Sequence, residues 1–121
     1  MRYVNQSIIY RGHFALMTSQ NLTQPMQNLC AHKLRVLADP TRLSVLELLR
    51  ERPRHVGEIN TVLQLEQSLL SHHLKILRNE GFVSSIRDGK AVLYHLASDV
   101  RLQNGAKGIN LGCCILSFSN P

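Results

Sequence analysis

The chain lacks tryptophan, has no long hydrophobic run, and contains three cysteines among its 121 residues. Its longest apolar stretches are a few residues long, which is too short to cross a bilayer. An odd number of cysteines cannot form a closed disulfide framework within one chain, so we expect a reduced, cytoplasmic protein. These features exclude a membrane-spanning protein and argue against a disulfide-rich secreted domain.

The N-terminal segment also lacks the pattern of a secretory signal. Its apolar region is short and is interrupted by Arg11 and His13. The polar stretch MTSQNLTQP that begins at Met17 has a composition typical of a mobile terminus. We therefore expect residues 1–21 to form a disordered extension, and Met17 is a second candidate for the natural start.

The remaining composition is that of a basic globular domain. Hydrophobic residues make up 44% and charged residues 18%, which favours one domain with a single core. Lys plus Arg number 14 against 8 Asp plus Glu, so the net charge is +6. Nucleic acid or another polyanion is a plausible partner for such a chain.

Hydrophobic periodicity predicts helices followed by a hairpin. Asp39 is a good N-cap and Pro40 suits the first position of a helix. After Gly81 the period becomes alternating, and Asp88-Gly89 is a strong hairpin turn signal. The predicted helices span residues 24–36, 40–50, 55–63 and 67–79, and the predicted strands span residues 82–87 and 91–96.

This order of elements predicts a mainly α fold with a β-hairpin wing, the winged helix-turn-helix. We assign residues 22–98 to this domain, with its first helix used for dimerisation. We assign residues 99–121 to a C-terminal dimerisation and sensor tail. Ser98-Asp99 could cap a last helix there, but the glycines at 105, 108 and 112 would make it short or frayed, and residues 115–118 favour extended chain.

The helix predicted over residues 67–79 has one polar and one apolar face. Small hydrogen-bonding groups and one cation are what a major-groove recognition helix needs. The alternative is an ordinary amphipathic helix with a solvated face. The preceding helix and the following hairpin favour recognition. The polar set is Gln67, Ser68, Ser71, His72 and Lys75, and the apolar set is Leu70, Leu74 and Leu77.

Other polar residues near this helix have different expected roles. His73 lies on the apolar side, so we expect a semi-buried histidine that bonds to a backbone group rather than a metal ligand. Arg87 and Lys90 flank the hairpin turn and are candidates for phosphate contacts, with solvated surface charge as the alternative. Arg54, before the 55–63 helix, is a further phosphate candidate.

Several motifs together resemble the ArsR/SmtB family of bacterial transcriptional repressors. They are LADPTRL at residues 37–43, QSLLSHHLKIL at 67–77, GFV at 81–83 and RDGK at 87–90. The resemblance implies a dimeric winged helix-turn-helix repressor that binds an imperfect palindrome and leaves DNA when an inducer binds. It also implies a dimer interface formed by the first and last helices, here residues 24–36 and the segment after Ser98.

The familiar metal sites of that family are absent. Residues 54–59 contain no cysteine pair, and residues 99–114 contain no histidine. What remains is the vicinal pair Cys113 and Cys114, with Cys30 as a possible third sulfur ligand. Three thiolates suit arsenite, antimonite or another thiophilic metal ion. Persulfide or oxidant sensing is the rival interpretation, and simple packing of the cysteines is a third.

The sequence distinguishes three classes of function: a DNA-binding repressor, a thiol-dependent enzyme and a module for protein contacts. A thiol-dependent enzyme would need a nucleophile-base pair on a defined scaffold, and the sequence shows neither that pair nor a phosphate-binding loop. A module for protein contacts alone would not need the polar face of the 67–79 helix. We therefore predict a homodimeric DNA-binding repressor of operator DNA that is not an enzyme and requires no cofactor.

Overall fold

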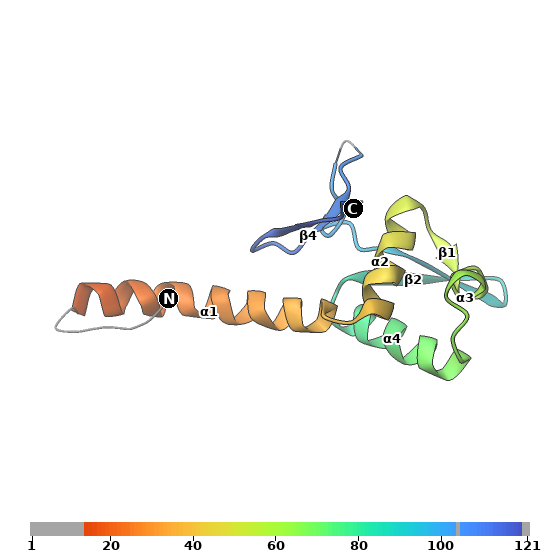
Figure 1. The fold of residues 1–121 in the computed structure, drawn as a ribbon, viewed down its shortest axis with the longest axis horizontal. Helices are drawn as coiled ribbons and strands as arrows, with labels where there is room; N and C mark the ends of the chain where they lie inside the picture. Colours follow the sequence, from red (N-terminus) through yellow and green to blue (C-terminus); the bar gives the residue numbers. More distant parts are fainter. Residues whose placement is uncertain (1–13, 104, 120–121) are drawn as a thin grey trace.

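The computed structural model describes residues 14–103 and 105–119 as helices flanked by two small sheets (Figure 1). The helices are α1 (Phe14–Leu37), α2 (Pro40–Glu51), α3 (Val56–Leu63) and α4 (Gln67–Asn79). The strands are β1 (Arg54–His55), β2 (Val83–Asp88), β3 (Ala91–Leu96), β4 (Gly108–Asn110) and β5 (Ile115–Ser117). The predicted mainly α fold with a hairpin wing is confirmed.

The ends of α2 and α4 follow from local capping chemistry. Asp39 Oδ1 accepts a hydrogen bond of 2.9 Å from Arg42 N, which satisfies one of the unpaired N–H groups in the first turn of α2. Gly81 follows α4 with φ +83°, a conformation that glycine adopts without strain. The predicted bounds of α4, residues 67–79, are confirmed.

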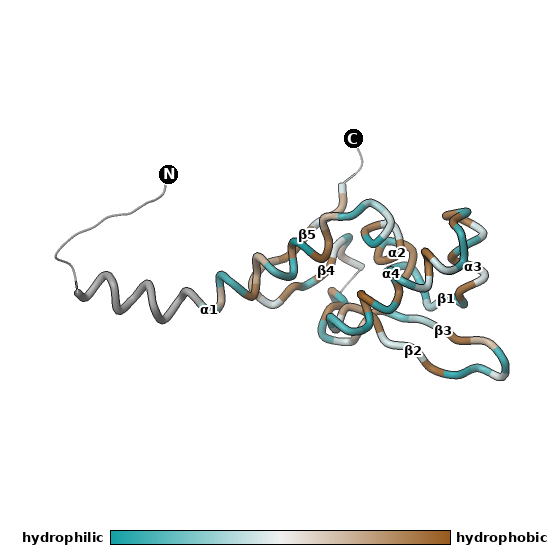
Figure 2. The backbone as a smooth tube through the Cα atoms, turned by 90° about the horizontal axis from the view of Figure 1, so that it is seen from below, coloured by the Kyte–Doolittle hydropathy of each residue, from teal (hydrophilic) through white to brown (hydrophobic). Residues whose placement is uncertain are grey.

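The wing is a three-stranded antiparallel sheet in the order β1-β3-β2. Its hairpin closes where Asp88 faces Ala91, and Gly89 in the turn has φ +64°. The short strand β1 adds Arg54 opposite Tyr94, a pairing that the sequence did not predict. Figure 2 shows the β2–β3 hairpin projecting away from the helices.

One hydrophobic core connects the helices to the base of the wing. Side chains from α2, α3 and α4 meet there, together with residues of the wing and of the C-terminal segment. Burial of these side chains is the main stabilising term of the fold. The largest fully buried ones include Leu46, Leu49, Ile59, Leu70, Leu74, Leu77, Phe82, Ile109 and Leu111.

Helix α1 begins earlier than predicted. It starts at Phe14, inside the stretch of residues 1–21 that we expected to form a disordered extension, and it continues through Pro25. A proline removes one helical hydrogen bond but its fixed φ is compatible with the helix. Residues 1–13 lie outside the described part of the chain. Leu29 and Leu34 of α1 are exposed in the single chain.

The C-terminal segment forms a hairpin instead of the helix that Ser98-Asp99 could have capped. Strands β4 and β5 pair in antiparallel register, with Ile109 opposite Leu116. A side chain at Gly108 would collide with the backbone oxygen of Leu116, so a glycine is needed there. The glycine-rich sequence therefore favours close strand pairing over a helix.

The hairpin β4–β5 lies above α1 and beside the winged helix (Figure 1). Ile109 and Leu111 join the core, which anchors the hairpin to α2. Among the described residues, none of the helices combines the length and the apolar character that a bilayer crossing requires.

Candidate DNA-binding face and cysteine cluster

Helix α4 presents its polar face to solvent, as the sequence predicted. The side chains of Leu70, Leu74 and Leu77 are buried on the opposite face. Because the two faces differ so sharply, α4 can pack and still offer polar groups to a ligand. Leu69, 44% exposed, borders the polar face. The predicted polar residues are all exposed, namely Gln67, Ser68, Ser71, His72 and Lys75.

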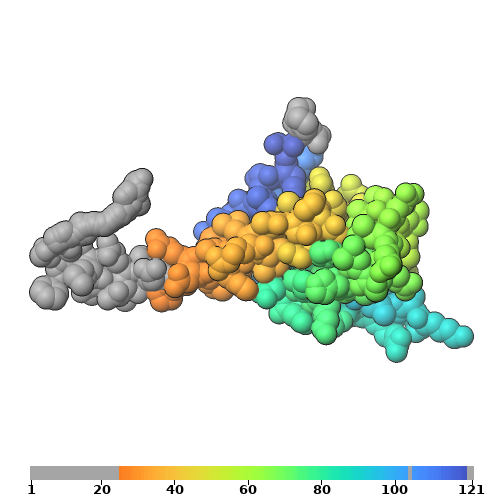
Figure 3. All heavy atoms as spheres, turned by 60° about the horizontal axis from the view of Figure 1, so that its bottom comes forward, coloured from red at the N-terminus to blue at the C-terminus, as the bar shows by residue number. Residues whose placement is uncertain are grey.

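The wing places two cations beside α4. Arg87 and Lys90 are exposed on either side of the turn, and Figure 3 shows the wing next to α4 on one face of the molecule. This arrangement supplies both a helix that fits a groove and basic groups that fit a phosphate backbone.

Arg54 is placed differently from the other candidate cations. Its guanidinium donates to Leu48 O at 3.1 Å and to Glu51 Oε1 at 2.6 Å. The side chain is 12% exposed, so most of it lies against the protein. The structure therefore does not bring Arg54 onto the open basic face as a free cation.

His55 fastens the tip of the wing to the start of α3. Its Nε2 lies 2.8 Å from Asp88 Oδ2, and its backbone N donates to Glu58 Oε1 at 2.8 Å. The Asp88 hydrogen bond, assisted by Glu58, raises the pKa of His55 above its ordinary value. The hydrogen bond from His55 N, with that from Arg52, lowers the pKa of Glu58 to about 2.

His73 is buried, as predicted, but its partner is a side chain rather than a backbone group. Arg42 Nη1 lies 3.1 Å from His73 Nδ1. Because a guanidinium only donates, Nδ1 must accept, and the neutral ring then carries its proton on Nε2. Burial alone would raise the pKa of Asp39 nearby, but the hydrogen bond from Arg42 N and the Arg42 charge lower it.

The three cysteines of the chain come together within one protomer. Cys30 of α1 forms a disulfide with Cys113, across a sequence separation of 83. Cys114 is an exposed free thiol whose sulfur lies 3.7 Å from that of Cys30 and 3.9 Å from that of Cys113. We call these residues the cysteine cluster. The expectation of a fully reduced chain is wrong for this structure, because folding brings Cys30 and Cys113 into bonding range.

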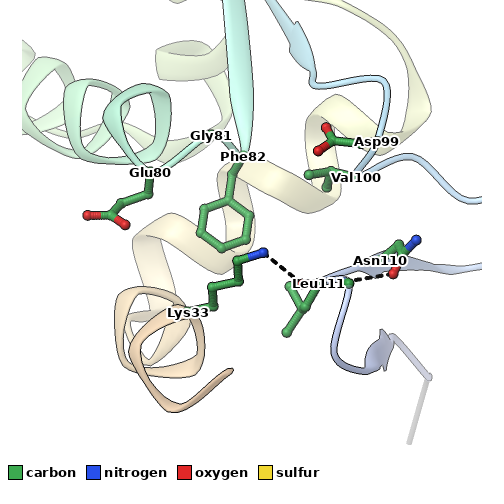
Figure 4. A pocket seen from close by; sticks show the side chains of 9 residues that line it. Lys33, Glu80, Gly81, Phe82, Asp99, Val100, Asn110 and Leu111 are labelled. Atoms are coloured by element: carbon green, nitrogen blue, oxygen red, sulfur yellow. Dashed lines mark hydrogen bonds between the residues drawn. The ribbon is translucent and has the colours of Figure 1, made fainter. Parts of the chain in front are cut away.

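The cysteine cluster connects α1 to the turn of the β4–β5 hairpin. A second link lies one helical turn further along α1, where Lys33 Nζ donates to Leu111 O at 2.8 Å (Figure 4). A cavity of 260 Å³ opens beside this link, between α1, the end of α4 and the hairpin. The hairpin is thus attached to α1 by two local contacts, one covalent and one polar.

The donor set of the cluster suits a three-coordinate thiophilic centre. All three sulfurs lie within 4.8 Å of one another. Two of them share a disulfide, so the cluster can ligate only after that bond is reduced. In the described part of the chain, this group contains no fourth ligand, which a structural zinc site would require.

Three polar residues that connect the elements escaped the sequence reasoning. They are Arg42, His32 and Lys33, and each contacts a residue far away in the sequence. Arg42 lies inside the LADPTRL motif, and this motif was the only sequence feature that could have drawn attention to one of the three residues. His32 and Lys33 gave none, because a charged residue on a helix usually faces solvent.

Comparisons with known proteins agree with this geometry. A family model described as "Bacterial regulatory protein, arsR family" matches residues 39–85. The uncharacterized HTH-type transcriptional regulator Rv0081 of Mycobacterium tuberculosis is 43% identical over 77 residues, covering 63% of this chain and 68% of that protein. Its crystal structure matches with a TM-score of 0.58 at 44% identity, covering 61% of this chain and 75% of that one.

Two further proteins resemble this chain, one in sequence and one in structure. The HTH-type transcriptional repressor SmtB of M. tuberculosis is 47% identical over 64 residues, covering 53% of this chain and 47% of that protein. A homodimeric winged helix-turn-helix domain of Mb0332 from Mycobacterium bovis has a TM-score of 0.57 at 28% identity, covering 63% of this chain and 70% of that one.

The fold and the exposed face of α4 define a winged helix-turn-helix DNA-binding regulator. The chain belongs to the ArsR/SmtB family of bacterial transcriptional regulators, as the sequence motifs indicated. This is a family of DNA-binding proteins rather than enzymes, so the predicted class of function is confirmed.

Proposed function

We propose that this chain is a homodimeric, cytoplasmic repressor whose affinity for a palindromic operator depends on the chemical state of the cysteine cluster. The observation that carries the proposal is the meeting of three sulfurs within 4.8 Å, drawn from α1 and from the turn of β4–β5. Two of these residues are distant in sequence from the third, so only the fold brings them together.

Operator binding follows from the exposed face of α4 and from the wing. His72 and Gln67 reach base edges in the major groove, while Ser68 and Ser71 allow close approach. Lys75, Arg87 and Lys90 contact phosphates, which adds affinity without sequence information. The net charge of +6 also favours binding to the negatively charged backbone of DNA.

Dimerisation is supported by apolar side chains that the single chain leaves uncovered. Met26, Leu29 and Leu34 of α1 are 65%, 53% and 44% exposed, and Ile115 of β5 is 60% exposed. A two-fold dimer through α1 and the C-terminal hairpin would bury them and place two α4 helices on successive turns of DNA. Leu102, in the segment after Ser98 that we expected at this interface, is half-buried within its own chain.

In the reduced protein the cysteine cluster takes a thiophilic inducer such as arsenite or antimonite. Three thiolates and no nearby fourth ligand match the preference of such centres for soft sulfur donors. Binding would pull the hairpin turn against α1 and favour a dimer arrangement that fits the operator poorly. An inducer acts only through such a difference in affinity for two states.

The disulfide between Cys30 and Cys113 favours a second candidate signal, oxidation. Two thiols give two electrons and two protons to peroxide, which leaves one disulfide and two water molecules. This reaction closes the same contact between α1 and the hairpin that a thiophilic ion would close. Both signals therefore act at one place and lead to the same release of DNA.

The test compares operator binding by the wild type with binding by Cys30→Ser, Cys113→Ser and Cys114→Ser. Each reduced protein is titrated with arsenite and, separately, with peroxide. We expect a ten- to a hundredfold loss of wild-type affinity, corresponding to about 1.4–2.8 kcal/mol of coupling. Loss of the arsenite response in all three variants supports a three-sulfur inducer site.

The peroxide arm separates the two signals. If Cys114→Ser still responds to peroxide while the other two variants do not, the Cys30–Cys113 pair is the redox switch. If every variant releases DNA as the wild type does under both treatments, the cysteine cluster is not the sensor and the proposed regulation is wrong.

A further inference from the structure

Two polar links join α1, which carries Cys30, to the recognition helix α4. One runs from Val36 O of α1 through Arg42 to His73 of α4. The other runs directly from His32 of α1 to Glu80, the residue that caps the C-terminus of α4. Figure 1 shows the end of α1 meeting the region where α4 ends.

Arg42 makes the more specific of the two links. Its Nε donates to Val36 O at 2.6 Å, and its Nη1 donates to His73 Nδ1 at 3.1 Å. Val36 belongs to the last turn of α1, where carbonyl groups have no helical partner. A guanidinium can serve two acceptors in different directions at once, whereas an ammonium has no such planar fork.

The acceptor on α4, His73, is buried and lies next to a residue of the proposed DNA-binding face. His73 is 8% exposed and packs among the buried residues of α4, so its ring cannot swing freely. The next residue toward the N-terminus of α4 is His72, which is exposed on the face proposed to read DNA. A displacement passed to His73 therefore moves the DNA-reading side chains of the same rigid helix.

His32 and Glu80 form a weaker second link. His32 Nε2 lies 2.8 Å from Glu80 Oε1, but the two side chains are 49% and 32% exposed. Solvent screens such a pair, so its contribution is small. It nevertheless restrains the C-terminal end of α4 against the same helix that carries Cys30.

We propose that Arg42 is a positioning residue that couples the cysteine cluster to DNA binding, by fixing the recognition helix α4 to the last turn of α1. This rests on the proposed response of the repressor to its cysteines. A change at Cys30 shifts α1 relative to the hairpin, and Arg42 passes this shift to His73. In a dimer the result is a change in the spacing of the two α4 helices, which must match one turn of DNA.

The experiment measures the ratio of operator Kd between peroxide-oxidised and reduced protein, for the wild type, Arg42→Lys and Arg42→Met. Arg42→Lys keeps the positive charge but lacks the planar fork that directs donors at both acceptors, and Arg42→Met removes the donors. We expect the ratio to fall from ten- to a hundredfold in the wild type to less than about threefold in both variants. The thiol titre should still fall on oxidation as it does in the wild type.

The matched control is Arg101→Gln. Arg101 also donates to a backbone carbonyl, but that carbonyl, Arg50 O at 3.4 Å, belongs to α2 rather than to α1 or α4. This control should keep the wild-type ratio. His32→Gln, which changes only an exposed link, should lower the ratio by no more than about twofold. It provides a folded variant even if the Arg42 variants unfold.

A purely structural role for Arg42 makes a different prediction. Loss of stability alone would lower the melting temperature and weaken both forms on the operator alike, leaving the ratio unchanged. An unchanged ratio in Arg42→Lys, with normal thiol chemistry, therefore overturns this proposal while the proposed function stands. If the Arg42 variants do not fold, a wild-type ratio in His73→Leu, which removes the acceptor on α4, overturns it instead. If the wild type itself shows no change on oxidation or with arsenite, the proposed function fails, and the coupling role of Arg42 falls with it.

Discussion

The winged helix and the α1–hairpin region of this protein are stabilised in different ways. The elements from α2 to β3 share one continuous core, in which residues such as Leu46, Ile59 and Leu70 are fully buried. The α1–hairpin region depends on a disulfide, on the bond from Lys33 to Leu111, and on the docking of Ile109 into the core. Its α1 helix leaves several large apolar side chains exposed.

This difference means that the winged helix, which contacts DNA, is rigid, whereas the α1–hairpin region can change its arrangement. A region with many buried contacts keeps its geometry, whereas a region with few contacts opens at lower free energy and can be shifted by a ligand. Breaking the dimer or the cysteine cluster should therefore alter α1 and the hairpin while leaving the shape of the winged helix intact.

The largest expected effect is in the core of the winged helix. Leu70→Ala removes a fully buried side chain and should lower the free energy of unfolding by about 2–5 kcal/mol. Urea unfolding of the reduced protein measures this loss. The matched variant Leu29→Ala changes a side chain that is 53% exposed and should cost less, with a dependence on protein concentration. Equal losses at all concentrations would contradict the contrast between the two regions.

Reduction of the disulfide should act on the other region. Opening a covalent loop typically lowers the free energy of unfolding by about 2–4 kcal/mol, because the unfolded chain gains freedom. Amide hydrogen exchange should accelerate in the described part of α1 and in β4–β5, but not in α4. Cys114→Ser leaves the Cys30–Cys113 bond in place and should behave as the wild type. Uniform acceleration along the chain would argue against two separate regions.

Within the winged helix, substitutions in α4 and in the wing should change DNA binding in different ways. His72→Ala should weaken operator binding by about 1–3 kcal/mol and relax sequence preference, because a base contact is lost. Lys90→Ala should weaken all sequences alike and reduce the salt dependence by about one unit of slope. Gel shifts with operator and random DNA over a salt series measure both. An unchanged operator-to-random ratio in His72→Ala would remove that residue from the groove.

The smallest expected effect is a pH dependence of stability that comes from the hydrogen bond between His55 and Asp88 at the wing. The pKa of His55 is raised above its ordinary value of 6.5, so the folded state binds this proton more tightly than the unfolded state. Its contribution to stability is therefore fully present below about pH 6.5 and is lost as the pH rises through the raised value. Both partners are well exposed, so salt should weaken the effect.

NMR titration of the His55 ring measures this pKa directly. Asp88→Asn should lower the pKa toward 6.5, with Glu58 still contributing a part. His95→Gln, which changes another histidine of the wing, serves as the control and should leave the His55 titration in place. An Asp88→Asn protein with an unchanged His55 pKa would show that Asp88 does not set it.

Sequence patterns were sufficient for the winged helix because its signals are local. Asp39 and Pro40 mark the start of α2, and Gly81 marks the end of α4. The three-to-four-residue spacing of Leu70, Leu74 and Leu77 identified the buried face, and so the exposed one. Each of these features is decided by residues within a few positions of one another.

The remaining features depend on contacts that local patterns do not contain. The sequence suggested Cys30 as a third sulfur, but only the packing of α1 on the hairpin places it beside Cys113. Arg42 was visible as part of a motif, yet its bond to His73 spans two elements. The hairpin of β4 and β5 was missed because weak helix signals at Ser98-Asp99 competed with glycine-rich pairing.

The bond between Cys30 and Cys113 also closes the chain into a covalent ring that contains the whole winged helix, since the two residues are separated by 83 positions. A single backbone cut in the wing would open this ring but leave both fragments on one molecule. In the reduced protein the same cut would release two separate chains. Electrophoresis of nicked protein, with and without reductant, would therefore reveal the redox state of the chain by size alone.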